Sequence, residues 1–258
     1  MILALDVGNS SIMIGGFQGK ELLFTARIRT DSTKTSDEYC IDLMSILDVY
    51  HYSREDIRGS IIASVVPQVT NACKTALRKI CGKEPLVVEP GLKTGLDIRI
   101  DNPDLIGADL VVGAVAALQE HKPPMIVVDM GTATSMMVLD DTGALIGGCI
   151  CPGVQVSLDA LTSRTALLPG LQLDEPKRAI GKNTIECMRS GVMLGAASML
   201  DGMVVRMEEE LGQKTAVVIT GRIAKFVSPM CRTPLIYEKD LTLKGLNAIY
   251  LQNHKENS

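Results

Sequence analysis

The chain has 258 residues, of which 46% are hydrophobic and 22% are charged, and it carries a formal net charge of -4. This is enough apolar material for one large domain or for two domains of about 100–150 residues each. The acidic balance, the absence of a basic stripe and an aromatic content of 3% argue against a nucleic-acid-binding protein. An anionic nucleotide remains possible as a ligand, because backbone N–H groups and a metal ion can neutralise its phosphates locally.

Seven scattered cysteines are typical of reduced cytosolic thiols rather than of a disulfide framework. The N-terminus lacks the basic region and cleavage site of a signal peptide. No stretch approaches the roughly 18 apolar residues of a membrane span. We therefore expect a cytoplasmic protein without a membrane partner, ending in a loose polar tail over residues 252–258.

Hydrophobic periodicity predicts three strands joined by glycine-rich turns at the start of the chain, followed by alternating helices and strands. The expected elements of the first half are strands at Ile2–Asp6, Ile12–Phe17 and Leu22–Arg29, a helix at Ser36–Tyr50, a strand at Gly59–Val66, a helix at Val69–Ile80, a strand at Pro85–Val88 and a helix at Gly107–Glu120.

From Met125 onward the opening pattern returns. Strands are expected at Met125–Val128, Ser135–Leu139, Ala144–Ile150 and Ala216–Thr220, with helices at Gln155–Leu161 and Thr184–Leu211, the latter interrupted by glycines. Such a repeat indicates an internal duplication, and strands alternating with helices indicate the α/β class. We predict two lobes, residues 1–118 and 119–258, with a cleft between them.

An Asp-x-Gly turn follows the first strand of each half. The first is Asp6-Val7-Gly8-Asn9-Ser10-Ser11 and the second is Asp129-Met130-Gly131-Thr132-Ala133-Thr134. Backbone amides and hydroxyls of such a turn can bind a phosphate, while its carboxylate holds Mg²⁺ directly or through water. One such turn is equally typical of an ordinary hairpin. Two in equivalent places favour an ATP-dependent phosphotransferase.

Asp109 is the candidate general base. It lies in the first turn of the expected Gly107–Glu120 helix, after the small residues Gly107 and Ala108, which would let a ligand approach. Transfer of a phosphoryl group to an alcohol requires a base for the hydroxyl proton. A carboxylate in a first turn also suits the helix dipole, and the sequence leaves both interpretations open.

Two further glycine-rich segments are open to two interpretations each. Gly147–Gly153 is either a bulge or a place where substrate approaches the backbone. Thr220-Gly221-Arg222 is either an adenosine-binding turn or a plain connection from strand to helix.

In their order and spacing these motifs resemble those of type III pantothenate kinases over nearly the whole chain. The matching segments are Asp6–Ser10, Thr94-Gly95-Leu96, Asp101-Asn102-Pro103, Gly107-Ala108-Asp109, Asp129–Thr134, Gly147-Gly148 with Pro152-Gly153, Gly181–Thr184 and Leu241–Leu246. The resemblance implies an actin-like ATPase (ribonuclease H-like) fold and a homodimer. It also implies phosphorylation of pantothenate to 4'-phosphopantothenate, the first step of coenzyme A biosynthesis.

The resemblance also implies roles for particular residues. ATP with Mg²⁺ would be bound by Thr132 and the first loop, which comprises Asp6, Val7, Gly8, Asn9, Ser10, Ser11, Ile12 and Met13. Asp109 would be the catalytic base, and Asp129 would hold a monovalent cation, K⁺ or NH₄⁺. Asp6 would be the other metal-binding residue, for the Mg²⁺ that accompanies ATP. The pantothenate pocket would be lined by Ile100, Gly107, Ala108, Asp109, Leu110 and Thr184.

Three positions depart from the family pattern, which commonly has Tyr, Arg and Gly where Ile100, Leu110 and Arg222 stand here. Leu110 matters most, because loss of a charged hydrogen bond to substrate costs about 1.5–3 kcal/mol. Two alternatives to a pantothenate kinase therefore stay open. One is a non-catalytic paralogue that acts as a ligand sensor or regulatory subunit, and the other is a kinase of another small alcohol.

Overall fold

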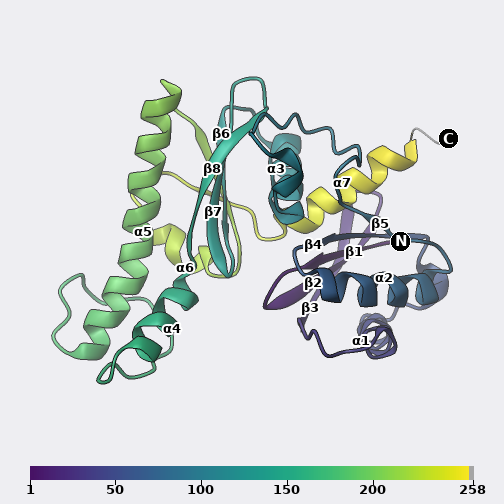
Figure 1. The fold of residues 1–258 in the computed structure, drawn as a ribbon, viewed down its shortest axis with the longest axis horizontal. Coiled ribbons are helices and arrows are strands. Elements are labelled where there is room, and N and C mark those ends of the chain that lie inside the picture. The colour runs from purple at the N-terminus through teal and green to yellow at the C-terminus, as the bar shows by residue number, and fades with distance from the viewer. Residues whose placement is uncertain (256–258) are drawn as a thin grey trace. The chain divides into compact units, whose positions relative to one another are not determined.

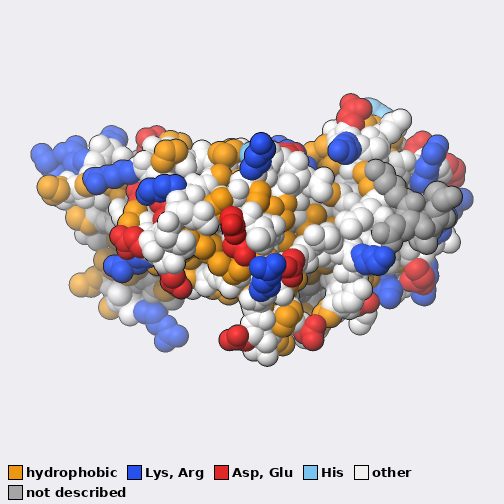
Figure 2. All heavy atoms as spheres, turned by 90° about the horizontal axis from the view of Figure 1, so that it is seen from above, with side chains coloured by type: hydrophobic (Ala, Val, Ile, Leu, Met, Phe, Trp, Pro, Cys, Tyr) orange, Lys and Arg blue, Asp and Glu red, His pale blue; other side chains and the backbone are white. Residues whose placement is uncertain are grey.

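A computed structural model of the chain, described over residues 1–255, divides into two units (Figure 1). The first unit comprises residues 1–96, residues 101–119 and the C-terminal segment from Asp240. The second comprises Asp97–Ile100 and Glu120–Lys239. Acidic and basic side chains are intermixed with hydrophobic ones on the face drawn in Figure 2. None of the described helices is both long and apolar enough to cross a bilayer.

A five-stranded sheet forms the centre of the first unit, in the order β3-β2-β1-β4-β5. Its first three strands form an antiparallel meander, whereas β4 runs parallel to β1 and β5 parallel to β4. The strands are β1 (Ile2–Val7), β2 (Ser11–Gln18), β3 (Glu21–Arg29), β4 (Gly59–Ser64) and β5 (Leu86–Val87).

Helices cover both faces of this sheet. On one face, α1 (Ser36–Val49) and α2 (Pro67–Cys81) pack on a core that includes Leu5 and Leu77. On the other, α3 (Ala108–Glu120) and α7 (Leu241–Lys255) pack on a core that includes Ala4, Val112 and Leu246. Short 3-10 helices lie at Arg54–Asp56 and Pro103–Leu105.

The second unit repeats this sheet, in the order β10-β9-β6-β7-β8. Its strands are β6 (Met125–Met130), β7 (Ala133–Leu139), β8 (Leu145–Pro152), β9 (Ala216–Thr220) and β10 (Ile236–Tyr237). The strands β6-β7-β8 are antiparallel neighbours, as β1-β2-β3 are, and β9 is parallel to β6 as β4 is to β1. The α/β class and the internal duplication predicted from the sequence are therefore confirmed.

The helices of the second unit are α4 (Val154–Arg164), α5 (Thr184–Leu211) and α6 (Ala224–Val227), with a 3-10 helix at Ser228–Met230. All three α-helices contribute to one core with β6, β7 and β9. The predicted interruption of α5 by glycines is wrong, since the helix runs unbroken over 28 residues. Its glycines lie on the exposed side, while Val192, Met193 and Leu200 face the core.

The C-terminal segment differs most from what the sequence predicted. No helix was expected there, yet α7 buries Leu243, Leu246 and Ile249 in the core of the first unit. The division 1–118 and 119–258 assigned this segment to the second lobe, whereas the structure groups it with the first unit. Residues 252–255 of the predicted loose tail continue α7, and residues 256–258 lie outside the described residues.

Candidate active site

The first Asp-x-Gly loop is a closed backbone turn between β1 and β2. The Gly8 amide donates to the Ser11 carbonyl over 3.1 Å. From the connection after β3, the Thr30 hydroxyl donates to the Gly8 carbonyl over 2.6 Å and the Thr30 amide donates to the Ser10 carbonyl over 3.3 Å. These bonds connect the loop to the segment after β3, and the side chains of Asn9 and Ser10 are exposed.

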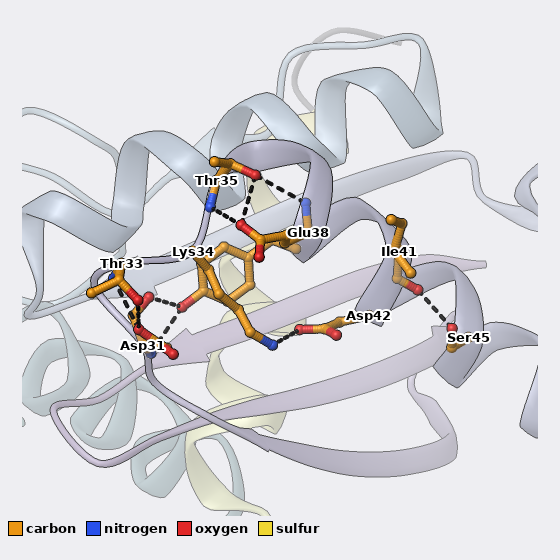
Figure 3. A network of polar contacts seen from close by, with 9 residues as sticks. Asp31, Thr33, Lys34, Thr35, Glu38, Ile41, Asp42 and Ser45 are labelled. Carbon is orange, nitrogen blue, oxygen red and sulfur yellow. Dashed lines mark hydrogen bonds and ion pairs between the residues drawn. The ribbon is translucent and has the colours of Figure 1, made fainter.

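A polar network begins at Asp31, the residue after Thr30, and runs into α1 (Figure 3). The Tyr39 hydroxyl donates to the Asp31 carbonyl over 2.8 Å and accepts from the Asp31 amide over 3.0 Å. Thr35 and Glu38 form a capping box at the start of α1, in which the Glu38 carboxylate accepts from the Thr35 amide over 2.7 Å. The cap satisfies backbone donors that the first turn of a helix leaves unpaired.

The residues predicted for the ATP loop divide into two kinds. The side chains of Val7 and Ile12 are 0% exposed in the core below α1 and α2, so only their backbone could meet a ligand. Met13 packs against the opposite core. Because side chains alternate along a strand, Asp6 lies on the same face as Ala4, the face that α3 covers. Carboxylate, amide and hydroxyl oxygens beside backbone N–H groups form a donor set that suits Mg²⁺ and phosphate.

Asp109 lies near the same end of the sheet as this loop. The Val65 amide, just beyond β4, donates to the Val7 carbonyl at the end of β1 over 3.1 Å. A Cβ atom on Gly107 would lie 3.6 Å from the Val65 side chain. The start of α3 is therefore next to the ends of β1 and β4, on the face that carries Asp6. Both predicted carboxylates of the first unit belong to one region.

The Asp109 carboxylate is held close to its own helix start. The Leu110 amide donates to Asp109 Oδ1 over 2.9 Å. Burial raises the pKa of Asp109 above its ordinary value of 3.8, and backbone hydrogen bonds only partly offset this rise. A raised pKa makes the carboxylate a better proton acceptor once it is ionised. The absence of a side chain at Gly107 allows this arrangement, because a Cβ atom there would displace Asp109 Oδ1.

The remaining predicted pantothenate residues belong to both units. Gly107, Ala108 and Leu110 lie at the start of α3, with the last two half-buried. Ile100 belongs to the second unit, where its neighbour Arg99 pairs with β8 through an amide that donates to the Leu145 carbonyl over 2.8 Å.

The second Asp-x-Gly loop occupies the equivalent place in its own sheet. Asp129 is the fifth of six residues in β6, as Asp6 is in β1, and it pairs in register with Ser135 of β7 and Thr220 of β9. The Gly131 amide donates to the Ala133 carbonyl over 2.9 Å. The Thr132 carbonyl accepts from the Gly153 amide over 3.1 Å, and Thr132 is exposed.

Thr134, which the sequence prediction did not select, carries an unsatisfied hydroxyl in this loop. The residue is 1% exposed, and its Oγ1 has no hydrogen-bond partner among the described residues. An unsatisfied buried hydroxyl costs about 1–3 kcal/mol, and such groups in native structures commonly meet an ion or a water. Its place in the Asp129 turn, rather than its residue type, is the signal that would have identified it.

Gly221 is explained by close packing between strand ends. Its φ is +101°, and a Cβ atom there would lie 2.6 Å from the Met130 carbonyl oxygen. The turn that follows β9 therefore needs glycine for backbone reasons alone. This favours the plain-turn interpretation of Thr220-Gly221-Arg222 over a requirement for adenosine.

Thr184 is the exposed first residue of α5 and lies beside a cavity of about 200 Å³. Asn183 caps the helix, since its Oδ1 accepts from the Glu186 amide over 2.9 Å. The cavity is rich in basic groups that the sequence prediction did not select. It is lined by Pro176, Lys177, Arg178, Asn183, Ile185, Glu186 and Arg189. The Arg189 Nε atom is buried without a hydrogen-bond partner among the described residues, so this cavity suits an anionic group.

Comparisons with known proteins agree with this organisation. The family model described as type III pantothenate kinase matches residues 2–206. A type III pantothenate kinase of Exiguobacterium sp. strain AT1b is 42% identical over 99% of this chain and 100% of its own. One from Moorella thermoacetica is 41% identical over 98% of this chain and 100% of its own.

Among solved structures, the activator of the 2-hydroxyisocaproyl-CoA dehydratase from Clostridium difficile, with bound ADPNP, aligns with a TM-score of 0.59 at 12% identity. It covers 99% of this chain and 96% of its own. This likeness shows the fold, which is that of the actin-like ATPases.

Proposed function

The chain belongs to the type III pantothenate kinase family, and we propose that Asp109 is the base with which it phosphorylates pantothenate at the expense of ATP. The reaction is the first step of coenzyme A biosynthesis. The observation that carries the assignment of the base is the half-buried Asp109 carboxylate, on the same sheet face and near the same strand ends as Asp6. Full-length identity of 41–42% to type III pantothenate kinases supports the reaction.

Asp109 would accept the proton of the pantothenate primary hydroxyl as its oxygen attacks the γ-phosphorus of ATP. The backbone N–H groups of Gly8–Ser11 and the side chains of Asn9 and Ser10 would bind the phosphates. Asp6 would hold the divalent ion. Mg²⁺, when bound, neutralises the charge that develops on the transferred phosphoryl group.

The second unit would supply a monovalent-cation site and further ligand contacts. Asp129 would bind K⁺ or NH₄⁺. Thr132 would contact ATP. Thr184 and Ile100 would contact pantothenate, and the basic cavity next to Thr184 would provide positive charge for an anionic group. A homodimer and a cytoplasmic location remain predictions.

A coupled assay of ADP release tests the assignment of the base. Asp109→Asn should lower kcat by about 10²–10⁴-fold in the presence of ATP, Mg²⁺, K⁺ and pantothenate. Asp104→Asn is the matched control, because Asp104 is an exposed aspartate in the preceding 3-10 helix. Its kcat should stay close to that of the wild type.

Activity should also require K⁺ or NH₄⁺. Asp129→Asn should no longer be activated by either ion, whereas Asp141→Asn in the exposed β7–β8 turn should be activated as the wild type is.

The same assay decides between the alternatives that Leu110 raised. Wild-type protein that binds pantothenate and ATP without releasing ADP would identify a ligand sensor. Turnover on another alcohol but not on pantothenate would identify a kinase of a different substrate. Equal rates for Asp109→Asn and the wild type would refute Asp109 as the base.

A further inference from the structure

A cluster of one histidine and two glutamates lies in the second unit, outside all of the loops described above. Glu120 ends α3, His121 follows it, and Glu238 comes directly after β10. One ligand atom of each residue lies within 4.8 Å of the others. Backbone hydrogen bonds connect Glu238 and Pro124, a residue close to His121 in the chain, to β9. The Glu238 amide donates to the Ile219 carbonyl over 2.9 Å, and the Ala216 amide donates to the Pro124 carbonyl over 3.2 Å.

The His121 ring nitrogen in this cluster is buried and unsatisfied. Nε2 has no hydrogen-bond partner among the described residues, and the side chain is 19% exposed. Its distance to Glu238 Oε1 is 3.8 Å, which is too long for a hydrogen bond. Two ligand atoms that bind the same metal ion, each at about 2.0–2.2 Å, can lie as far as about 4 Å apart. The spacing therefore suits an ion between them.

We propose that His121 Nε2 and the carboxylates of Glu120 and Glu238 bind a divalent transition-metal ion of the Zn²⁺ class. Imidazole nitrogen together with carboxylate oxygen favours Zn²⁺, Co²⁺ or Ni²⁺ over Mg²⁺, which takes oxygen ligands. Three protein ligands leave a fourth position for water. The ion joins the segment that enters β6 to the segment that leaves β10.

This placement gives the ion a structural task. The first unit is interrupted after Gln119 and resumes at Asp240, so the three ligands lie next to two of the four points where the chain passes between units. A metal bound at these points ties together both ends of the Glu120–Lys239 segment. It is separate from the divalent ion proposed to accompany ATP, and it requires no kinase activity.

The alternative is an ion pair between protonated His121 and Glu238. A metal ion or a charged carboxylate would each interact favourably with the His121 ring nitrogen. Only the metal site takes up an ion, and it requires a neutral imidazole. The seven free cysteines could bind added metal as well. A spectroscopic probe must therefore report which ligands surround the ion.

The test uses the full chain, stripped with a chelator and then titrated with Zn²⁺ in a calorimeter and with Co²⁺ in an absorption spectrometer. We expect one Zn²⁺ per chain, a higher Tm with Zn²⁺, and Co²⁺ d–d bands without a thiolate charge-transfer band. Glu238→Gln and Glu120→Gln preserve side-chain shape and should each weaken Zn²⁺ binding by at least about tenfold. His121→Ala should abolish it, with circular dichroism as the check on folding.

Glu210→Gln is the control, since Glu210 is an exposed glutamate of the same unit, near the end of α5. It should bind Zn²⁺ as the wild type does. The proposal fails if wild-type protein binds no Zn²⁺, if the Co²⁺ spectrum shows thiolate ligation, or if the three cluster variants bind as tightly as the control.

Discussion

At the scale of single residues, Asp109 and Gly107 act as a pair. Burial raises the pKa of the Asp109 carboxyl, and the absence of a side chain at Gly107 leaves room for that carboxylate. The plain helix-dipole interpretation of Asp109 explains neither feature. A carboxylate placed only to complement a dipole would be stable in solvent and would need no space cleared beside it.

Gly107→Ala should therefore damage catalysis more than stability. The new Cβ would displace Asp109 Oδ1, and a misplaced base costs on the order of 10²-fold in kcat. Gly170→Ala is the matched control, because a Cβ there meets nothing within 4 Å. Steady-state kinetics and thermal melts of both variants measure the difference. Unchanged kcat in Gly107→Ala would show that the carboxylate position is unimportant.

The raised pKa of Asp109 also predicts a pH dependence of stability. Between the unfolded pKa, near 3.8, and the higher folded pKa, the folded state retains a proton that the unfolded state has lost. The contribution of the Asp109 proton to the free energy of unfolding is therefore fully present below about pH 3.8, and it is lost as pH rises through the folded pKa of Asp109. Asp109→Asn should be at least as stable as the wild type at pH 7, and the difference should shrink as pH falls through this window.

Urea unfolding of both proteins across that range measures the effect. Asp104→Asn, at an exposed site, should follow the wild type at every pH. A stability gap that grows as the pH falls would contradict the assigned direction of the pKa shift.

At the scale of elements, α7 belongs to the core that supports the site. Leu246 is 0% exposed and shares a cluster with Ala4 of β1 and Val112 of α3, the helix that carries Asp109. Leu246→Ala should lower the free energy of unfolding by about 2–5 kcal/mol, because it leaves a cavity. Leu105→Ala should be nearly neutral, since Leu105 is 83% exposed.

Hydrogen exchange shows which unit the change affects. In Leu246→Ala, amides of β1, β4 and α3 should exchange faster while those of β6 and β9 keep their protection. Equal acceleration in β6 would mean that α7 stabilises both units alike.

At the scale of the whole molecule, we relate the proposed homodimer to two exposed isoleucines of the second unit, both in β8. Side chains alternate along β8, and Ile146 and Ile150 point outward with 38% and 69% of their area exposed. Burial of such side chains in a second copy would remove apolar area from water.

Ile150→Asp should therefore convert the dimer to a monomer, because it places a charge in that interface. Sedimentation equilibrium measures the mass directly. Leu105→Asp, which changes an exposed leucine of the first unit, should remain dimeric. A wild-type protein that sediments as a monomer would refute the homodimer itself.

What the sequence alone determines is local and repeated. The strand and helix periods, the two Asp-x-Gly turns and the duplication depend on short-range patterns of burial and backbone preference, so they could be predicted from the residues in order. The carboxylates Asp6, Asp109 and Asp129 were selected in this way. The buried hydroxyl of Thr134 and the basic cavity beside Thr184 were not, because burial and hydrogen-bond satisfaction are properties of packed neighbours.

Only the tertiary structure placed α7 in the first unit and brought Glu238 to His121. Both depend on contacts between segments far apart in the chain. No local periodicity encodes such contacts, because they follow from which apolar faces remain to be covered once the sheets have formed. Close backbone approaches decide the rest, as at Gly107 and Gly221, where the space available to a side chain exists only in the assembled fold.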